Sequence, residues 1–331
     1  MNSFTLLLKG IEMTVAICST QLTTLKQTIA FISYHQKIGI VHIFIFFDNP
    51  NDEIITSVSS INIVTAIPCN QDYWQQHQGR PDSIEKRQKI NADYAVNLCR
   101  MLDVEWLLHI DVDEFFNYDS NGTVTEFFEK YPDNIVTVRF PVCEAIPTKL
   151  EHHNFLTEIK NFRCQPITYR NTMKMTFSQK SAIKHDLYLM KLKRIIMKII
   201  GLEQYAKYGF MKAYIAGKSA TRVDTRITSM GLHSSRIEYQ PHQYGLIAND
   251  SRILHFDGFS YDTWYQKWLK RLDGRGTSIL MHDERLQQLL DFKKCYDSND
   301  NDALLKLYKH IYFIDKKGKN WLQKLGLIKQ F

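Results

Sequence analysis

The 331-residue sequence has few residues that interrupt secondary structure, with 14 glycines and 8 prolines, and it has no C-x-x-C pair. It also lacks a low-complexity linker and an internal repeat, so we expect one large domain or two closely joined ones. No apolar run approaches the roughly 20 residues of a membrane-spanning helix, and the run near Met1 is too short for a signal peptide. The sequence therefore predicts a globular protein without a membrane anchor.

Nucleic-acid-binding motifs are absent as well, because no helix-turn-helix, RNP or zinc-finger spacing occurs. The formal net charge of +7 is a modest basic excess for this length. It fits an anionic partner such as a nucleotide diphosphate, an acidic glycan or an anionic membrane surface, and we expect no nucleic-acid partner. The six cysteines are scattered, several of them within apolar runs, which favours free thiols in a reducing compartment.

What the sequence does contain, over its first 116 residues, is an alternation of apolar strands and amphipathic helices. The predicted strands cover residues 14–18, 41–47, 61–68 and 105–110, and the predicted helices cover about 22–38 and 84–102. This order is typical of an α/β fold with a mostly parallel central sheet and helices on both faces. Ligands of such folds bind beyond the carboxyl ends of the strands, where Asp48 and Asp111 are expected. The second half is less regular and ends in a basic helical segment.

Two carboxylates, Asp111 and Asp113, directly follow the apolar segment 105–110. In an ideal strand, residues two apart point to the same face, so the pair is predicted to hold one ion between its side chains. Oxygen ligands suit Mn²⁺ or Mg²⁺, and such an ion offsets the charge that develops on a leaving phosphate group. The alternative interpretation is a solvated acidic turn, which is common in aspartate-rich loops. The apolar strand before the pair and Glu114-Phe115 after it favour the metal site.

Four segments, in this order along the chain, resemble family-2-like and family-92-like glycosyltransferases, which have the GT-A fold. The segments are Ser33 to Asn49 (with His35, Gly39 and Asp48), Glu85 to Asn91 (with Arg87 and Gln88), the D-x-D-E-F stretch ending at Phe115, and Ile253 to Phe256 with the aromatic and basic helix after it. The clear resemblance covers about residues 14–145, with patches at 207–271. The sequence departs from the family at 19–21, where Ser-Thr-Gln replaces an acidic pair, and it matches poorly beyond Phe140.

The resemblance implies a metal-dependent hexosyltransferase-type enzyme with a GT-A-like fold. It would move a sugar from a nucleotide-sugar donor, with UDP favoured, to a hydroxyl of a glycan or lipid-linked glycan. Residues 1–145 would form the donor-binding half, 146–275 the acceptor side, and 276–331 a basic helical end. The implied setting is polysaccharide or lipooligosaccharide synthesis by a cytoplasmic enzyme, peripheral on the inner face of the plasma membrane. The basic apolar segments 191–200 and 316–331 would be interfacial helices or ordinary amphipathic helices that face the core.

The resemblance also implies roles for individual residues. Asp48 would contact the base or ribose, or simply form a turn, and His255 would join Asp111 and Asp113 as a metal ligand, or be a buried histidine, with His233 as a competitor. The remaining predicted contacts to the donor's phosphates come from basic and amide side chains and from the first aspartate: Arg87, Gln88, Asn91, Asp111, Lys218 and Arg222. Lys218 and Arg222 would reach the diphosphate from a mobile loop. The basic residues of this set are alternatively solvated surface charges.

Activation of the acceptor hydroxyl needs a carboxylate base, for which Glu144 and Asp257 are the candidates. The sequence leaves an inverting and a retaining mechanism open. Two other functions also fit the residues: a non-catalytic nucleotide- or glycan-binding protein of the same fold, and a phosphatase with an aspartyl nucleophile in D-x-D. The phosphatase is disfavoured because that motif normally follows the first strand of its fold, whereas here it follows the fourth.

Overall fold

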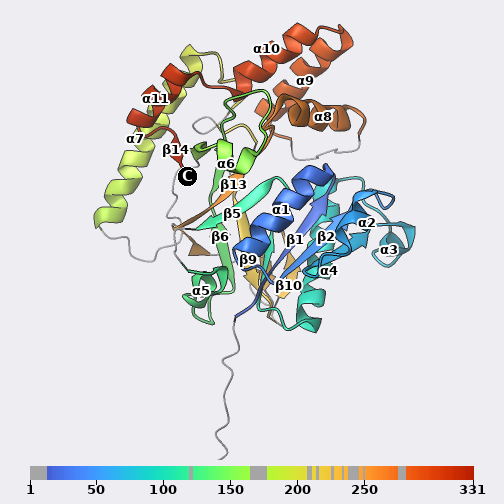
Figure 1. Cartoon of the computed structure of the whole chain (residues 1–331). Helices are drawn as coiled ribbons and strands as arrows, with labels where there is room; N and C mark the ends of the chain where they lie inside the picture. Colours follow the sequence, from blue (N-terminus) through green and yellow to red (C-terminus); the bar gives the residue numbers. More distant parts are fainter. Residues whose placement is uncertain are drawn as a thin grey trace, which may run out of the picture.

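The protein is described here by a computed structural model, shown in Figure 1. The described residues are 13–118, 122–164, 177–206, 211–213, 216–224, 227–232, 235–237, 246–248, 250–274 and 281–331. Predicted features at the N-terminus and at His233 lie outside these ranges.

A seven-stranded sheet forms the centre of the N-terminal half, in the order β12-β6-β9-β4-β1-β2-β3. Its strands are β1 (Val15–Gln21), β2 (His42–Phe47), β3 (Val64–Pro68), β4 (Trp106–His109), β6 (Thr137–Phe140), β9 (Lys218–Arg222) and β12 (Leu246–Ile247). All of them run parallel except β9, which is antiparallel to both β4 and β6. The predicted α/β class with a mostly parallel sheet is therefore confirmed.

Helices cover both faces of this sheet because successive residues of each buried strand point to opposite sides. Val15 and Ile17 of β1 belong to the apolar cluster that includes Phe31 of α1 (Leu25–Lys37). Ala16 and Cys18 belong to a second cluster, with residues of α4 (Ile84–Met101). The short helix α2 (Ile54–Val58) connects β2 to β3, and the short helix α3 (Gln71–Gln75) lies between β3 and α4.

A second, five-stranded sheet was not predicted from the sequence. Its order is β14-β8-β7-β13-β5, formed by β5 (Glu114–Tyr118), β7 (Val142–Ala145), β8 (Asn161–Cys164), β13 (Ser251–His255) and β14 (Lys329–Gln330). Three pairs of consecutive strands pass from the first sheet to the second: β4 to β5, β6 to β7, and β12 to β13. The D-x-D stretch lies at the first of these crossings.

A disulfide joins Cys143 to Cys164, which are direct partners across β7 and β8. The prediction of free thiols is thus wrong for this pair, because cysteines spaced 21 residues apart give no local signal of pairing in a sheet. The other cysteines, Cys18, Cys69, Cys99 and Cys295, are free.

Helices make up most of the rest of the described chain. They are α5 (Val124–Glu129), α6 (Phe155–Glu158), α7 (Phe177–Ile199), α8 (Tyr261–Leu272), α9 (Asp283–Asp297), α10 (Asn301–Tyr312) and α11 (Lys316–Lys324), and a small hairpin is formed by β10 (Ile227–Met230) and β11 (Ser235–Ile237). Helices α8, α9 and α10 contact one another, and α7 and α11 both lie toward the left edge of the view in Figure 1. A third apolar cluster, which includes Trp264, Phe292 and Tyr308, joins them. The predicted division at residues 145 and 275 stays a prediction.

None of the helices in the described part of the chain is both long enough and apolar enough to cross a bilayer.

Candidate functional site

The D-x-D stretch is a turn, and this separates its two carboxylates. Strand β4 ends at His109, and the Glu114 amide donates to the Asp111 carbonyl at 2.9 Å. The Asp111 amide in turn donates to Glu114 Oε2 at 2.8 Å, which closes the turn. Strand β4 therefore ends before the pair, so the geometry of an ideal strand does not apply to Asp111 and Asp113. That the two carboxylates hold one ion between them stays a prediction. Each aspartate belongs to a cluster of its own.

The Asp111 cluster consists of Gln88, Asp111, Glu114 and Lys218. Asp111 accepts from Lys218 Nζ at 2.8 Å and from Gln88 Nε2 at 2.6 Å, and Lys218 Nζ also lies 3.3 Å from Glu114 Oε2. Burial alone would raise the pKa of Asp111, but the Lys218 ammonium outweighs it and lowers that pKa. The predicted residues Gln88, Asp111 and Lys218 thus meet, from α4, the D-x-D turn and β9.

The Asp113 triad consists of Asp113, His255 and Asp257, each of which offers one ligand atom within 4.8 Å of the others. Asp113 Oδ2 lies 3.4 Å from His255 Nε2, and the Phe256 amide donates to the Asp113 carbonyl at 2.8 Å, which holds the turn against β13. Two carboxylates and an imidazole are ligands that Mn²⁺ and Mg²⁺ sites use. Among the described residues, this group best suits a metal ion, and it contains the predicted ligands Asp113 and His255 but not Asp111.

Cations surround the triad. Lys267 Nζ lies 2.9 Å from Asp113 Oδ2 and 2.6 Å from Asp257 Oδ1. Arg285 NH1 lies 3.1 Å from Asp257 Oδ2, and the Tyr312 hydroxyl donates to the same oxygen at 3.0 Å. Burial would raise the pKa of both carboxyls, yet Lys267 with His255 at Asp113, and Arg285 with Lys267 at Asp257, hold each pKa well below its usual range. The triad therefore carries two ionised carboxylates over the whole physiological pH range.

A cavity of about 1100 Å³ lies beyond the carboxyl ends of β1, β2 and β3. Asp48 lines it and is paired with Arg80 NH2 at 3.0 Å and Arg87 Nε at 2.8 Å. Trp74 lines it from α3, and its buried indole N–H has no hydrogen-bond partner in the structure. Asp273, at the end of α8, closes the other side. Of the two cavities described here, this one is lined by predicted site residues, Asp48 and Arg87.

Two predicted residues, Arg87 and Asn91, make internal contacts. Arg87 is buried and donates to the carbonyls of Pro81 and Asp82 in addition to its ion pair. Asn91 donates to the Thr20 hydroxyl and accepts from the Tyr73 hydroxyl. The predicted contacts of Arg87 and Asn91 with phosphate stay predictions, while their observed role is to fix the loops around the cavity.

Arg222 is not brought to the site. Residues 218–222 form β9 rather than the predicted mobile loop, and the strand places Arg222 beside Trp106, at the end opposite Lys218. Its guanidinium lies over the Trp106 ring and donates to the Tyr131 carbonyl at 2.9 Å. The loop was predicted wrongly because β9 is a short polar strand whose two neighbours supply the hydrophobic contacts.

Glu144 is fully buried in β7. Its carboxylate accepts from the backbone amides of Lys212, at 2.8 and 3.1 Å, and of Ala213, at 2.7 Å. It lines neither of the two described cavities. Its role as the base, like that of the equally buried Asp257, stays a prediction.

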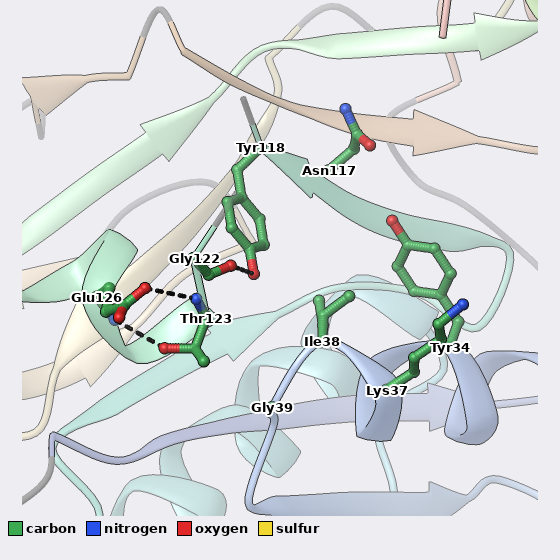
Figure 2. A pocket seen from close by; sticks show the side chains of 9 residues that line it. All are labelled: Tyr34, Lys37, Ile38, Gly39, Asn117, Tyr118, Gly122, Thr123 and Glu126. Atoms are coloured by element: carbon green, nitrogen blue, oxygen red, sulfur yellow. Dashed lines mark hydrogen bonds between the residues drawn. The ribbon is translucent and has the colours of Figure 1, made fainter. Parts of the chain in front are cut away.

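A smaller cavity of about 530 Å³ lies at the other end of the sheet, between α1 and the end of β5 (Figure 2). Tyr34 and Tyr118 flank it, and the Tyr118 hydroxyl donates to the Gly122 carbonyl at 3.1 Å. Glu126 is engaged with Thr123 in the capping box of α5. These polar groups stabilise local structure, and no predicted site residue lies among them.

Comparison with known proteins bears on the function of these clusters. The model of a family described as Glycosyltransferase family 92 matches residues 13–291. Two proteins of Arabidopsis thaliana, both described as glycosyltransferase-like, are 22% and 20% identical to this chain over 88% and 94% of its length. The chain spans only 65% and 61% of those relatives.

Solved structures are less similar. The structure of HddC from Yersinia pseudotuberculosis is 12% identical, with a TM-score of 0.35 over 77% of this chain and 97% of that one. The mannosyltransferase Ktr4p from S. cerevisiae is 15% identical, with a TM-score of 0.24 over 42% and 41% of the two chains. Similarities this weak add nothing to the argument from the residues.

Proposed function

The chain belongs to glycosyltransferase family 92, and from this premise we propose that it transfers a sugar from a nucleotide-sugar donor, with UDP favoured, to a hydroxyl of a glycan or lipid-linked glycan. The family-92 part of the resemblance noted in the sequence is thereby confirmed, and the family-2 part stays a prediction. We propose further that the reaction depends on Mn²⁺ or Mg²⁺. The donor and the acceptor are inferred from the family, and the metal is inferred from the Asp113 triad.

One observation carries this proposal: the cavity and the Asp113 triad lie along the same helix. Asp273 lines the cavity at the end of α8, and Lys267 contacts the triad from the same helix. Six helical residues span roughly 9 Å. A nucleoside in the cavity would therefore place its diphosphate near the triad, which is the arrangement that a nucleotide-sugar donor requires.

The residues fit divided roles. Asp48, paired with Arg80 and Arg87, lines the cavity and would accept hydrogen bonds from a base or ribose, and Trp74 lines the same cavity. Asp113, His255 and Asp257 would hold the metal, whose chemistry is to neutralise charge on the leaving diphosphate. Lys218, held by Asp111 and Glu114, adds a fixed positive charge beside the D-x-D turn.

The test is nucleotide binding, measured by thermal unfolding with UDP, GDP or CDP, each with and without Mn²⁺. A ligand at about 100 times its dissociation constant adds roughly 2.7 kcal/mol of stability, enough for a measurable rise in melting temperature. We expect a rise with UDP that needs both Mn²⁺ and Asp113, so that it is lost in Asp113→Asn. Asp297→Asn, which removes an exposed carboxylate of α9, is the matched control and should keep the rise.

The absence of any nucleotide effect in the unmodified protein would contradict the proposed donor. A nucleotide effect without release of UDP from any UDP-sugar, with a panel of glycan acceptors present, would favour the non-catalytic binding protein instead. Nothing in the site favours the phosphatase, because Asp111 is engaged by Lys218 and Gln88.

We also propose that the protein works on an anionic membrane surface, on the cytoplasmic side, where lipid-linked acceptors for polysaccharide or lipooligosaccharide would be found. Helix α7 supports this proposal, because its exposed side chains combine apolar and basic types: Leu187, Tyr188, Lys191, Arg194, Ile195, Lys198 and Ile199. The segment 187–200 contains no acidic residue, and α11, which belongs to the same apolar cluster as α7, exposes Trp321. Apolar and basic side chains together are typical of helices that lie in the headgroup region.

Sedimentation with lipid vesicles tests this surface. We expect binding to vesicles that contain phosphatidylglycerol and none to neutral phosphatidylcholine vesicles, with a decrease at high salt. Ile195→Glu should weaken the binding, whereas Leu286→Glu, at a similarly exposed position of α9, should not. Equal effects of the two variants, or no binding of the unmodified protein, would argue against α7 as the membrane-facing element.

A further inference from the structure

Lys267 occupies a position within the Asp113 triad that a metal ion would need. Its ammonium contacts Asp113 Oδ2 at 2.9 Å and Asp257 Oδ1 at 2.6 Å, so it bridges the two carboxylates. Asp113 Oδ2 is also the oxygen that lies 3.4 Å from His255 Nε2. The ammonium and a metal ion would therefore share the same oxygens.

The position of Lys267 is built into helix α8. Ser260 caps the helix, with its hydroxyl accepting from the Thr263 amide, and Trp264 and Trp268 are buried in the core on either side of Lys267 in the sequence. These contacts fix the rotation of the helix and hence the direction in which the lysine leaves it. The packing of α8 therefore places the Lys267 ammonium at the triad.

Arg285 is the other cation that contacts the triad, and its side chain is more buried than that of Lys267. Arg285 contacts Asp257 at 3.1 and 3.2 Å, donates to Gln288, and its side chain is 7% exposed. The Lys267 side chain is 32% exposed, and its flexible four-carbon stem allows the ammonium to leave without any movement of the helix. Of these two cations, Lys267 is the one that a metal ion can displace.

We propose that Lys267 is a tethered cation that competes with a divalent metal ion for Asp113 and Asp257. The inference rests on the proposed function insofar as it assigns the triad to a metal. Without the ion, the ammonium offsets the charge of the two carboxylates and keeps the triad assembled. Binding of the ion requires its displacement, so the metal affinity of the site is lower than its ligands alone would give.

The experiment measures Mn²⁺ binding without nucleotide, by the loss of the electron paramagnetic resonance signal of free Mn²⁺. The proteins are the unmodified chain, Lys267→Met, Lys267→Arg and Lys270→Met. We expect Lys267→Met to bind Mn²⁺ at least about tenfold more tightly, which corresponds to about 1.4 kcal/mol. Lys267→Arg retains the positive charge and should show no such gain.

Lys270→Met is the matched control, because it removes the same charge from the same helix, at a lysine that donates to the Leu22 carbonyl. Since the effect of a general change in charge is screened by salt, this variant should gain less than about threefold in affinity. Melting temperatures with and without Mn²⁺ show whether each variant is folded. If Lys267→Met folds only with Mn²⁺ present, the metal has replaced the ammonium, as the proposal requires.

Equal Mn²⁺ affinity of the unmodified protein and Lys267→Met overturns the proposal, and so does an equal gain in Lys270→Met or Lys267→Arg. These outcomes leave the donor site untouched, because the UDP-dependent rise in melting temperature is measured on the unmodified protein. Conversely, Mn²⁺ binding by Lys267→Met but not by the unmodified chain would support competition and contradict the proposed metal dependence.

Discussion

Lys212 is a buried lysine beside the site. Its ammonium lies 3.9 Å from Glu144 Oε2 and 3.6 Å from the centre of the Tyr312 ring, and it has no hydrogen-bond partner among the described residues. Burial lowers its pKa to about 7, and the nearby Glu144 offsets only part of this effect. The folded protein therefore favours the neutral amine.

This predicts a pH dependence of stability. Between pH 7 and 10.5, Lys212 is protonated in the unfolded chain but largely neutral in the folded one, so unfolding takes up a proton. Relative to Lys212→Met, the free energy of unfolding of the unmodified protein should rise with pH, by at most about 1.4 kcal/mol per pH unit. Denaturant unfolding of the two proteins across this range measures the difference. A flat difference for Lys212→Met would contradict the prediction.

Asp257 joins the triad to three helices, through Lys267 of α8, Arg285 of α9 and Tyr312 of α10. Asp257→Asn removes the charge but keeps the shape, and it leaves the buried Arg285 without its counter-ion. Breaking a buried pair in this way costs roughly 3–5 kcal/mol, which denaturant unfolding would detect. The exposed Asp297→Asn should cost less than about 0.5 kcal/mol. A similarly small loss for Asp257→Asn would mean that the surrounding cations find other partners.

At the level of residues, the sequence predicted those members of the site that follow a recognisable strand. Asp48, Asp113 and His255 each end or follow an apolar segment, and this pattern placed them at one edge. For Lys267 the signal was weaker, because the sequence showed only a basic residue about two turns into a helix that begins after Ser260. Arg285 and Tyr312 had none, because their arrival at Asp257 depends on how the last helices pack.

Helix α4 carries Arg87, Gln88 and Asn91 in its first turns, so its start matters for the site. The Ser83 hydroxyl accepts from the Lys86 amide and caps the helix. Ser83→Ala should cost about 1 kcal/mol and also weaken nucleotide binding several-fold, as measured by denaturant unfolding and nucleotide titration. Thr123→Ala removes the equivalent cap of α5 and should cost similar stability without loss of affinity. An equal loss of affinity in both variants would indicate a general effect of lower stability.

The disulfide between β7 and β8 links cysteines 21 positions apart. Closing a loop of this length lowers the entropy of the unfolded chain and stabilises the fold by about 3 kcal/mol in the chain-entropy model. We expect reduction, or the double change Cys143→Ala and Cys164→Ala, to lower the melting temperature accordingly. Cys295→Ala, at a free cysteine, should not. If a thiol count under denaturing conditions gives six free thiols, the bond does not form in the protein as produced.

Among the elements, the long apolar strands and the two main helices of the first sheet were predicted to within a few residues. Strands β5, β7 and β8 were missed because they are four or five residues long and take their stability from neighbours distant in sequence. Strand β9 was missed for the same reason, and its polar composition suggested a loop.

At the scale of the molecule, the last helices are joined to the site by ionic contacts at Asp257 and by the apolar cluster around Trp264 and Trp268. We therefore expect residues 281–331 to unfold together with the sheets. Tryptophan fluorescence, far-ultraviolet circular dichroism and hydrogen exchange in α9 and α10 should report one coincident transition. An earlier loss of protection in these helices would show that they form a separate unit, as the predicted boundary after residue 275 implies.

The position of β9 has a consequence for how the chain is made. It fills the gap between β4 and β6, yet it follows β6 by roughly 80 residues. At translation rates of about 5–20 residues per second, those two strands would wait about 4–16 seconds with open edges. Exposed strand edges promote aggregation, so a ribosome-bound fragment that ends before Lys218 should depend on chaperones far more than one that includes Arg222.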